Sequence, residues 1–146
     1  MNSMKDKFFI DTNIFVYSFN SENPEKQQKS HAIIRNALMN RKGCISYQVI
    51  QEFINVATRK FVVPLSFDDC KKYFDKVLTP LCDQYPGICL YQSAMDVMER
   101  WRFSFYDSLI VAAALQSDCR ILYSEDLQHN QKIRSLTVVN PFLESP

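Results

Sequence analysis

Short apolar runs recur along the chain, separated by longer segments in which apolar residues return every three or four positions. A brief apolar run between polar breaks is typical of a buried strand, whereas the three-to-four spacing is typical of a helix. The runs predict strands at residues 7–10, 44–45, 88–90, 120–123 and 136–139.

The segments between these runs predict helices. They are a short helix just after Asp11, then residues 24–39, 47–59, 67–78 with a stop at Thr79-Pro80, 92–101 and 105–116. Asn23 before Pro24 is typical of a helix cap followed by proline in the first turn. Residues 105–116 are apolar on nearly every side, so that helix should be central.

Short strands that alternate with helices favour an α/β fold of three layers, α/β/α, with a short, mostly parallel five-stranded sheet covered on both faces. The 146 residues show no repeat, low-complexity stretch or linker. A chain of this length suits one domain. We therefore predict a single domain over residues 1–146.

Composition narrows the function classes. A net charge of +1 argues against nucleic-acid binding through bulk positive charge, although a bound metal or a local basic patch can supply a positive field. Two glycines are too few for a Walker A loop or a Rossmann fingerprint, and two histidines and five unpatterned cysteines give no zinc-site spacing. Without a signal-peptide core or a membrane-length apolar run, we predict a cytoplasmic protein with reduced thiols.

Asp11 is the polar residue that fits its surroundings least. It lies inside the run Phe8-Phe9-Ile10-Asp11-Thr12-Asn13-Ile14, and a buried carboxylate without partners is costly. Asp11 therefore needs strong hydrogen bonds or a cation, unless it serves only as a helix cap. Its place at the carboxyl end of a strand is where open α/β sheets bind ligands.

Three further acids are expected at the same edge of the sheet. Asp126 follows the strand at 120–123, where either Glu125 or Asp126 points inward, unless both belong to a polar turn. Glu52 lies at the edge of an apolar helical stripe and is otherwise an ordinary boundary glutamate. Asp107 also completes a capping box with Ser104, a role compatible with metal binding because a carboxylate has several lone-pair sites.

Four carboxylates at one edge would repel one another unless divalent cations neutralised them. Oxygen ligands without nearby His or Cys favour Mg²⁺ or Mn²⁺. Such a cluster suits phosphodiester hydrolysis, because the metal lowers the pKa of the attacking water and stabilises charge on the phosphate.

Four short motifs together resemble the PIN-domain ribonucleases, and among these the VapC toxins of VapBC toxin–antitoxin pairs. They are Ile10-Asp11-Thr12-Asn13, Glu52 within Val49-Ile50-Gln51-Glu52-Phe53, Tyr106-Asp107-Ser108-Leu109-Ile110 before an alanine-rich segment, and Leu122-Tyr123-Ser124-Glu125-Asp126. The resemblance runs over essentially the whole chain, in order and with fitting spacing.

The resemblance implies a PIN-like fold and a Mg²⁺- or Mn²⁺-dependent endoribonuclease. Asp11 and Asp107 would be the principal metal ligands, and Glu52 a ligand or the residue that orients the water. Asp126 would complete the acidic set, directly or through a water.

The resemblance also implies supporting hydrogen bonds from Asn13 and Ser124, a homodimer, and a cognate antitoxin protein that blocks the site. Arg100 and Arg102, just before Asp107, are candidate RNA contacts, since arginine binds phosphate and neighbouring aromatic residues can stack on bases. Their neighbours Trp101 and Phe103 are alternatively core residues.

Other functions are also compatible with parts of the pattern. The main alternative is a catalytically weak PIN-like module that binds RNA or protein. A haloacid-dehalogenase-type phosphatase fits less well, because it needs a second aspartate where Asn13 stands. A receiver domain would need the acids distributed differently along the chain.

Overall fold

A five-stranded sheet forms the centre of the protein in a computed structural model that describes residues 6–83 and 86–143. The strand order is β2-β1-β3-β5-β4, and the strands are β1 (Phe8–Ile10), β2 (Gly43–Cys44), β3 (Ile121–Tyr123), β4 (Lys132–Ile133) and β5 (Leu136–Val139). All neighbouring pairs are parallel except β4 with β5. The predicted fold class is confirmed.

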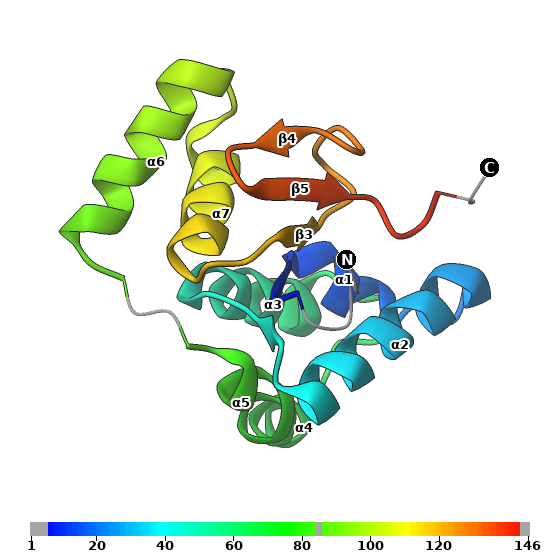
Figure 1. Ribbon diagram of the computed structural model, residues 1–146. Coiled ribbons are helices and arrows are strands. Elements are labelled where there is room, and N and C mark those ends of the chain that lie inside the picture. Colours follow the sequence, from blue (N-terminus) through cyan, green and yellow to red (C-terminus); the bar gives the residue numbers. More distant parts are fainter. Residues whose placement is uncertain (1–5, 84–85, 144–146) are drawn as a thin grey trace.

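Helices cover the sheet. They are α1 (Thr12–Tyr17), α2 (Pro24–Asn40), α3 (Tyr47–Arg59), α4 (Phe67–Tyr73), α5 (Thr79–Leu81), α6 (Ile88–Trp101) and α7 (Phe105–Gln116). Helices α6 and α7 lie side by side, and α2 lies at the other end of the sheet (Figure 1). Residues 108–114 of α7 are all buried, so its predicted central place is confirmed.

The order of the strands brings the first and last parts of the chain together. β1 is hydrogen-bonded to β2 on one side and to β3 on the other, with Phe9 opposite both Cys44 and Leu122. Because β1 and β3 are parallel neighbours, the residues that follow them leave the same edge of the sheet. Asp11 follows β1, and Ser124 to Asp126 follow β3.

Close packing of α2 against β2 requires a glycine at position 43. A Cβ added to Gly43 would lie 2.2 Å from the Cβ of Ala37 and 2.8 Å from the ring of Phe8. Both distances are shorter than any van der Waals contact, so a larger residue would push α2 away from the sheet.

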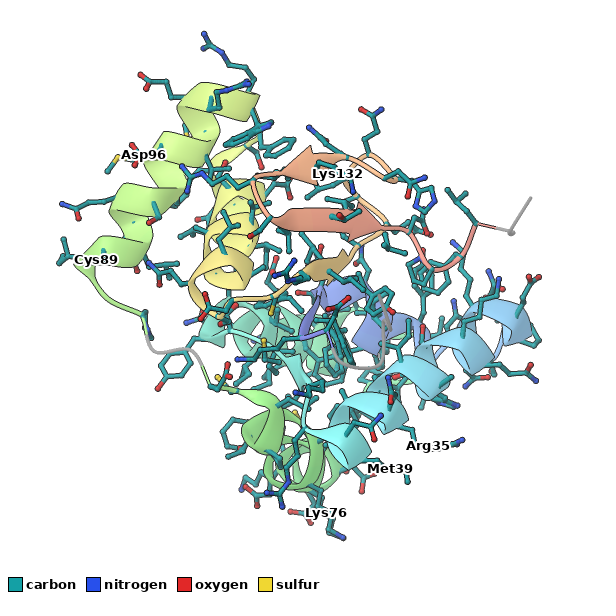
Figure 2. The ribbon with its side chains drawn as sticks, viewed as in Figure 1. Arg35, Met39, Lys76, Cys89, Asp96 and Lys132 are labelled. Carbon is teal, nitrogen blue, oxygen red and sulfur yellow. The ribbon has the colours of Figure 1, made fainter. Side chains whose placement is uncertain are left out.

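The strand predicted at residues 88–90 is wrong, because these residues form the first turn of α6. Ile88 is 73% exposed and Cys89 is also exposed, on the outer side of the helix (Figure 2). Only Leu90 is buried, and it continues into Ala94 and Val97 at helical spacing. Three consecutive apolar residues have the sequence pattern of a buried strand, although only one of their side chains enters the core.

The predicted helix stop at Thr79-Pro80 is also wrong. The segment continues through a π-helical turn, Phe74–Leu78, into α5, whose first turn contains Pro80. Proline is tolerated in a first turn because its missing N–H has no helical partner there. The strand β4 was not predicted, because Lys132–Ile133 lies in no apolar run and is a strand only through its antiparallel pairing with β5. The sequence also predicts a loop at residues 81–87, and part of it lies outside the described residues.

Candidate active site

Asp11 is a buried carboxylate that has two hydrogen-bond donors. It caps α1, where its Oδ1 accepts from the Thr12 backbone N–H at 2.7 Å. Its Oδ2 accepts from the Ser124 hydroxyl at 2.8 Å. The cap role and the buried position therefore coincide in one side chain that is only 7% exposed.

The pKa of Asp11 is raised to about 7. Burial is the largest cause, and the negative charges of Asp126 and Glu52 add to it, while the bonds from Ser124 and Thr12 oppose it. The hydrogen bonds from two neutral donors therefore do not offset the cost of burying the ionised carboxylate.

Asp126 is linked to Asp11 through one shared partner, Ser124. The Asn13 side-chain amide donates to both carboxylate oxygens of Asp126, at 3.0 and 3.1 Å. The Ser124 hydroxyl, which donates to Asp11, also accepts from the Asp126 backbone N–H at 3.3 Å. The structure thus brings Asn13 and Ser124 into contact with the two strand-end acids.

Glu52 approaches the strand-end acids from α3. Its Oε1 accepts from the Thr12 hydroxyl at 2.9 Å. Partial burial raises the pKa of Glu52, as do the charges of Asp107 and Asp126, while bonds from Thr12 and Gln48 lower it. Sequence reasoning missed Thr12 and Gln48 as site residues. The signal for Gln48 was its place one helical turn before Glu52.

Asp107 occupies the first turn of α7. Its backbone N–H donates to the Ser104 hydroxyl at 3.1 Å, which is one of the two bonds of the predicted capping box. The Asp107 charge raises the pKa of both Glu52 and Asp126, which places it near both. Within the described part of the chain, its carboxylate accepts no hydrogen bond and is available to a ligand.

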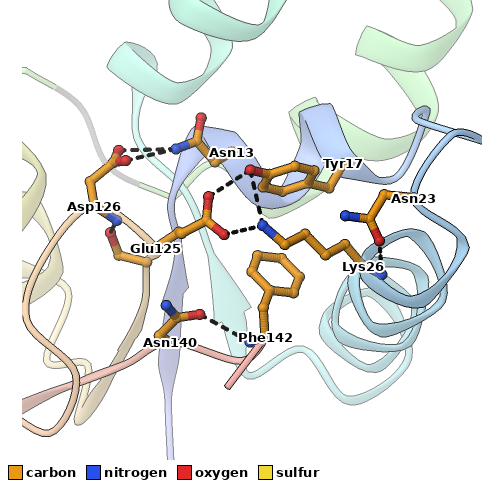
Figure 3. A network of polar contacts seen from close by, with 9 residues as sticks. Asn13, Tyr17, Asn23, Lys26, Glu125, Asp126, Asn140 and Phe142 are labelled. Carbon is orange, nitrogen blue, oxygen red and sulfur yellow. Dashed lines mark hydrogen bonds and ion pairs between the residues drawn. The ribbon is translucent and has the colours of Figure 1, made fainter. Parts of the chain in front are cut away.

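Glu125 faces away from the acids. Its carboxylate binds the Lys26 ammonium and accepts from the Tyr17 hydroxyl at 2.6 Å (Figure 3). The Lys26 nitrogen lies 4.4 Å from the centre of the Tyr17 ring and 5.1 Å from that of Phe142. Burial alone would raise the pKa of Glu125, but the bonds from Lys26 and Tyr17 outweigh burial and lower that pKa. This network ties α1, α2 and the C-terminal segment to the residue next to Asp126.

The two candidate RNA contacts, Arg100 and Arg102, lie at the carboxyl end of α6. The Arg100 guanidinium lies 5.0 Å from the ring centre of Trp101, and the Arg134 guanidinium lies 5.9 Å from the same ring centre. Trp101 and Phe103 are partly buried against the core. Among residues 6–83 and 86–143, no hydrogen bond or ion pair joins either arginine to the four acids.

Within the described residues, none of the four acids forms an ion pair with a cationic side chain. Ion pairs between described residues join Lys7 to Asp83, Lys26 to Glu125 and Lys29 to Glu25, none of which belongs to the group. Carboxylate oxygens that raise one another's pKa fit a divalent cation chemically. In the described ranges, however, no three His, Cys, Asp or Glu side chains are arranged to hold a metal ion. Side-chain rotation would have to complete such a site.

Comparison with protein families decides the fold family. Residues 8–133 match the family described as PIN domain. The chain belongs to the PIN-domain family. PIN domains are generally nucleases and typically use divalent metals. A search of curated proteins found no match to this chain.

The PIN assignment agrees with the resemblance carried by the four motifs, and all four acids lie within the matched residues.

Of the helices in the described ranges, none is both long and apolar enough to cross a membrane.

Proposed function

We propose that this PIN domain is a Mg²⁺- or Mn²⁺-dependent endoribonuclease that hydrolyses RNA at Asp11, Glu52, Asp107 and Asp126. The observation that carries the proposal is the buried Asp11 carboxylate, whose pKa is raised to about 7 and whose partners are neutral. A group in that state is stabilised in its charged form by a cation.

Each acid has a role that follows from its surroundings. Asp11 and Asp107 would hold the metal, and Asp126 would complete the set directly or through a water. The metal would supply an activated water and stabilise charge on the phosphate. Glu52, whose raised pKa makes it a stronger base than an ordinary glutamate, would orient that water or take its proton.

The neighbouring residues would keep the acids in place. Ser124 and Thr12 fix the two oxygens of Asp11, and Asn13 fixes Asp126. Outer-shell bonds of this kind set ligand orientation, and their loss typically weakens metal sites about 10- to 100-fold.

The resemblance to VapC toxins extends the proposal. It would make the chain the toxin of a toxin–antitoxin pair, acting on RNA in the cytoplasm as a homodimer and blocked by a cognate antitoxin. The activity would reside in one domain, residues 1–146.

A second function is favoured by one observation. Because no three acids in the described ranges are arranged to hold a metal, the chain could instead be a catalytically weak module that binds RNA or protein. This module would keep its affinity without metal.

Cleavage of total RNA by purified protein separates the two functions. We would compare Mg²⁺, Mn²⁺ and EDTA, with Asp107→Asn as the site variant and Asp96→Asn, on the outer side of α6 (Figure 2), as the matched control. Discrete fragments that require metal and Asp107, and that persist with Asp96→Asn, support the nuclease. Equal cleavage by Asp107→Asn, or no cleavage with either metal, would favour the binding module.

A further inference from the structure

A pocket of about 270 Å³ opens between the helices that carry Glu52 and Asp107. Its walls include Ser46, Tyr47 and Gln51 from the start of α3, Tyr91 from α6, and Phe105 and Tyr106 from the start of α7. Pockets that enclose drug-sized ligands are usually larger, about 300–1,000 Å³. The space therefore suits one planar ring system.

The pocket is continuous with the acidic site through Gln48. This residue lines the pocket, and its side-chain amide donates to the backbone carbonyl of Tyr106 at 3.1 Å. It also hydrogen-bonds Glu52, whose pKa it lowers. Tyr106 directly precedes Asp107, so both helices that supply acids to the site also supply walls to the pocket.

The pocket walls combine aromatic rings with side-chain amides. Tyr106 is 67% exposed, and Tyr91 and Tyr47 are exposed to a smaller extent. The Tyr106 ring meets Phe105 edge to face, with centroids 5.5 Å apart, which limits its orientation. Aromatic rings bind bases by stacking, and glutamine amides can hydrogen-bond base edges.

A buried polar group without a partner also lines the pocket. Ser46 is 4% exposed, and its hydroxyl makes no hydrogen bond in the described structure. It precedes α3 as the cap residue, yet its side chain makes no capping bond. Unsatisfied buried groups are rare in native proteins and call for a partner. A ligand in the pocket would supply one.

We infer that this pocket receives one RNA base next to the scissile phosphodiester and thereby selects the cleavage sequence. The inference rests on the proposed nuclease function. Tyr106 would stack on the base, while Gln51 and Ser46 would hydrogen-bond its edge. The amides, the hydroxyl and the rings among its walls, and the hydrogen bond from Gln48 to Glu52, favour a base over an apolar side chain of a partner protein.

The test is the base preference of cleavage in a pool of randomised RNA, read by sequencing the fragment ends. The variants are Tyr106→Leu, Gln51→Leu and Ser46→Ala. The matched controls are Phe67→Leu, an exposed aromatic in the first turn of α4, and Gln28→Leu, an exposed glutamine of α2. A preference is a ratio between sequences, so it is unaffected by an overall loss of rate.

We expect the wild-type protein and the two controls to prefer one base at one position beside the cut. Loss of Tyr106 should weaken binding of the base to the pocket roughly tenfold, in keeping with measured stacking on aromatic side chains, and the preference read by Gln51 and Ser46 should weaken because the base is held there less often. Gln51→Leu and Ser46→Ala should change which base is preferred. An unchanged profile in all three variants would overturn the inference, and would favour a partner-protein side chain as the occupant.

A second measurement separates this inference from the nuclease proposal. The four ribonucleoside 5′-monophosphates are titrated into the protein in EDTA, and binding is followed by NMR shifts of pocket residues. Selective binding of one nucleotide that Tyr106→Leu weakens supports the pocket even if no RNA is cleaved. Active cleavage without selective binding or base preference would overturn the pocket while leaving the nuclease proposal standing.

Discussion

The two halves of the acidic site are built differently. At the strand ends, Asp11 and Asp126 are joined through the Ser124 side chain and held by neutral donors. On the helices, Asp107 has no hydrogen bond to its carboxylate from any described residue, and Glu52 is reached by Thr12 and Gln48. The strand-end half is therefore fixed before any ligand arrives, whereas Asp107 in the helix-borne half is free to adjust.

This difference explains why the four carboxylates have the chemistry of a metal site although no three of them, among the described residues, are arranged to hold an ion. Within the strand-end half, the buried Asp11 carries the cost of desolvation, which appears as its raised pKa. The helix-borne half supplies the movement that brings ligands together. Each prediction below affects one half more than the other.

The largest expected effect is on the pH dependence of stability without metal. An acid whose pKa is raised from 3.8 to about 7 on folding contributes stability below pH 4 that is lost as the pH rises through 7. The free energy of unfolding should fall by up to about 4 kcal/mol over that range. Urea unfolding in EDTA from pH 4 to 8 measures it.

Asp11→Asn should flatten that profile, since asparagine does not titrate. Asp107→Asn should leave most of it in place. Glu125 acts in the opposite direction because its pKa is lowered, so its contribution is lost only as the pH falls through the acid range. A profile that is as steep in Asp11→Asn as in the wild type would place the pH dependence elsewhere.

Cleavage should depend on both halves alike. Asp11→Asn and Asp107→Asn should each lower the rate of RNA cleavage more than about a hundredfold, because losing a ligand costs more than losing an outer-shell partner. The rate is measured with a defined RNA at saturating Mn²⁺. Near-normal cleavage by either variant would remove that residue from the site.

Substitutions of two serines distinguish a residue that orients a metal ligand from a residue that only caps a helix. Ser124→Ala removes a donor from Asp11 and should weaken Mn²⁺ activation about 10- to 100-fold. Ser104→Ala removes the cap of α7 and should cost about 1 kcal/mol of stability. Titrations of activity against Mn²⁺ and urea unfolding give the two values. Equal effects of both variants on Mn²⁺ activation would contradict the distinction.

The smallest effect concerns the network around Glu125. Lys26→Met removes an ion pair that is partly exposed, so the expected loss of stability is at most about 1 kcal/mol. Cleavage should fall a fewfold, because Asp126 follows Glu125 directly. Lys29→Met, which removes an exposed i,i+4 pair with Glu25, is the control. Lys26→Arg should restore most of the activity, which a purely structural loss would not explain.

The sequence predicted the framework of the fold because its main elements have strong local patterns. The helices at 24–40 and 105–116 begin after capping residues that the sequence shows, and the helix at 47–59 follows its apolar stripe. Residues 88–90 were misassigned, since three apolar letters do not reveal which side chains enter the core. The strand at 132–133 exists through its antiparallel pairing with β5 rather than through its own residues.

The site was predicted in part for the same reason. Asp11 and Asp126 could be placed together, because strand ends share an edge once the sheet is parallel. The opposite directions of Glu125 and Asp126 could not be predicted, since they depend on Lys26 and Tyr17 from another part of the chain. The contact of Thr12 with Glu52 likewise requires the packing of α1 against α3, whereas Gln48 reaches Glu52 from one turn earlier in the same helix.

The most direct test of the central claim, that the acids of both halves share a divalent cation, is calorimetric titration of Mn²⁺ into the protein. The account predicts saturable binding by the wild type and by Asp96→Asn, weakened at least about tenfold in both Asp11→Asn and Asp107→Asn. Absence of binding by the wild type, or equal binding by all four proteins, would contradict it.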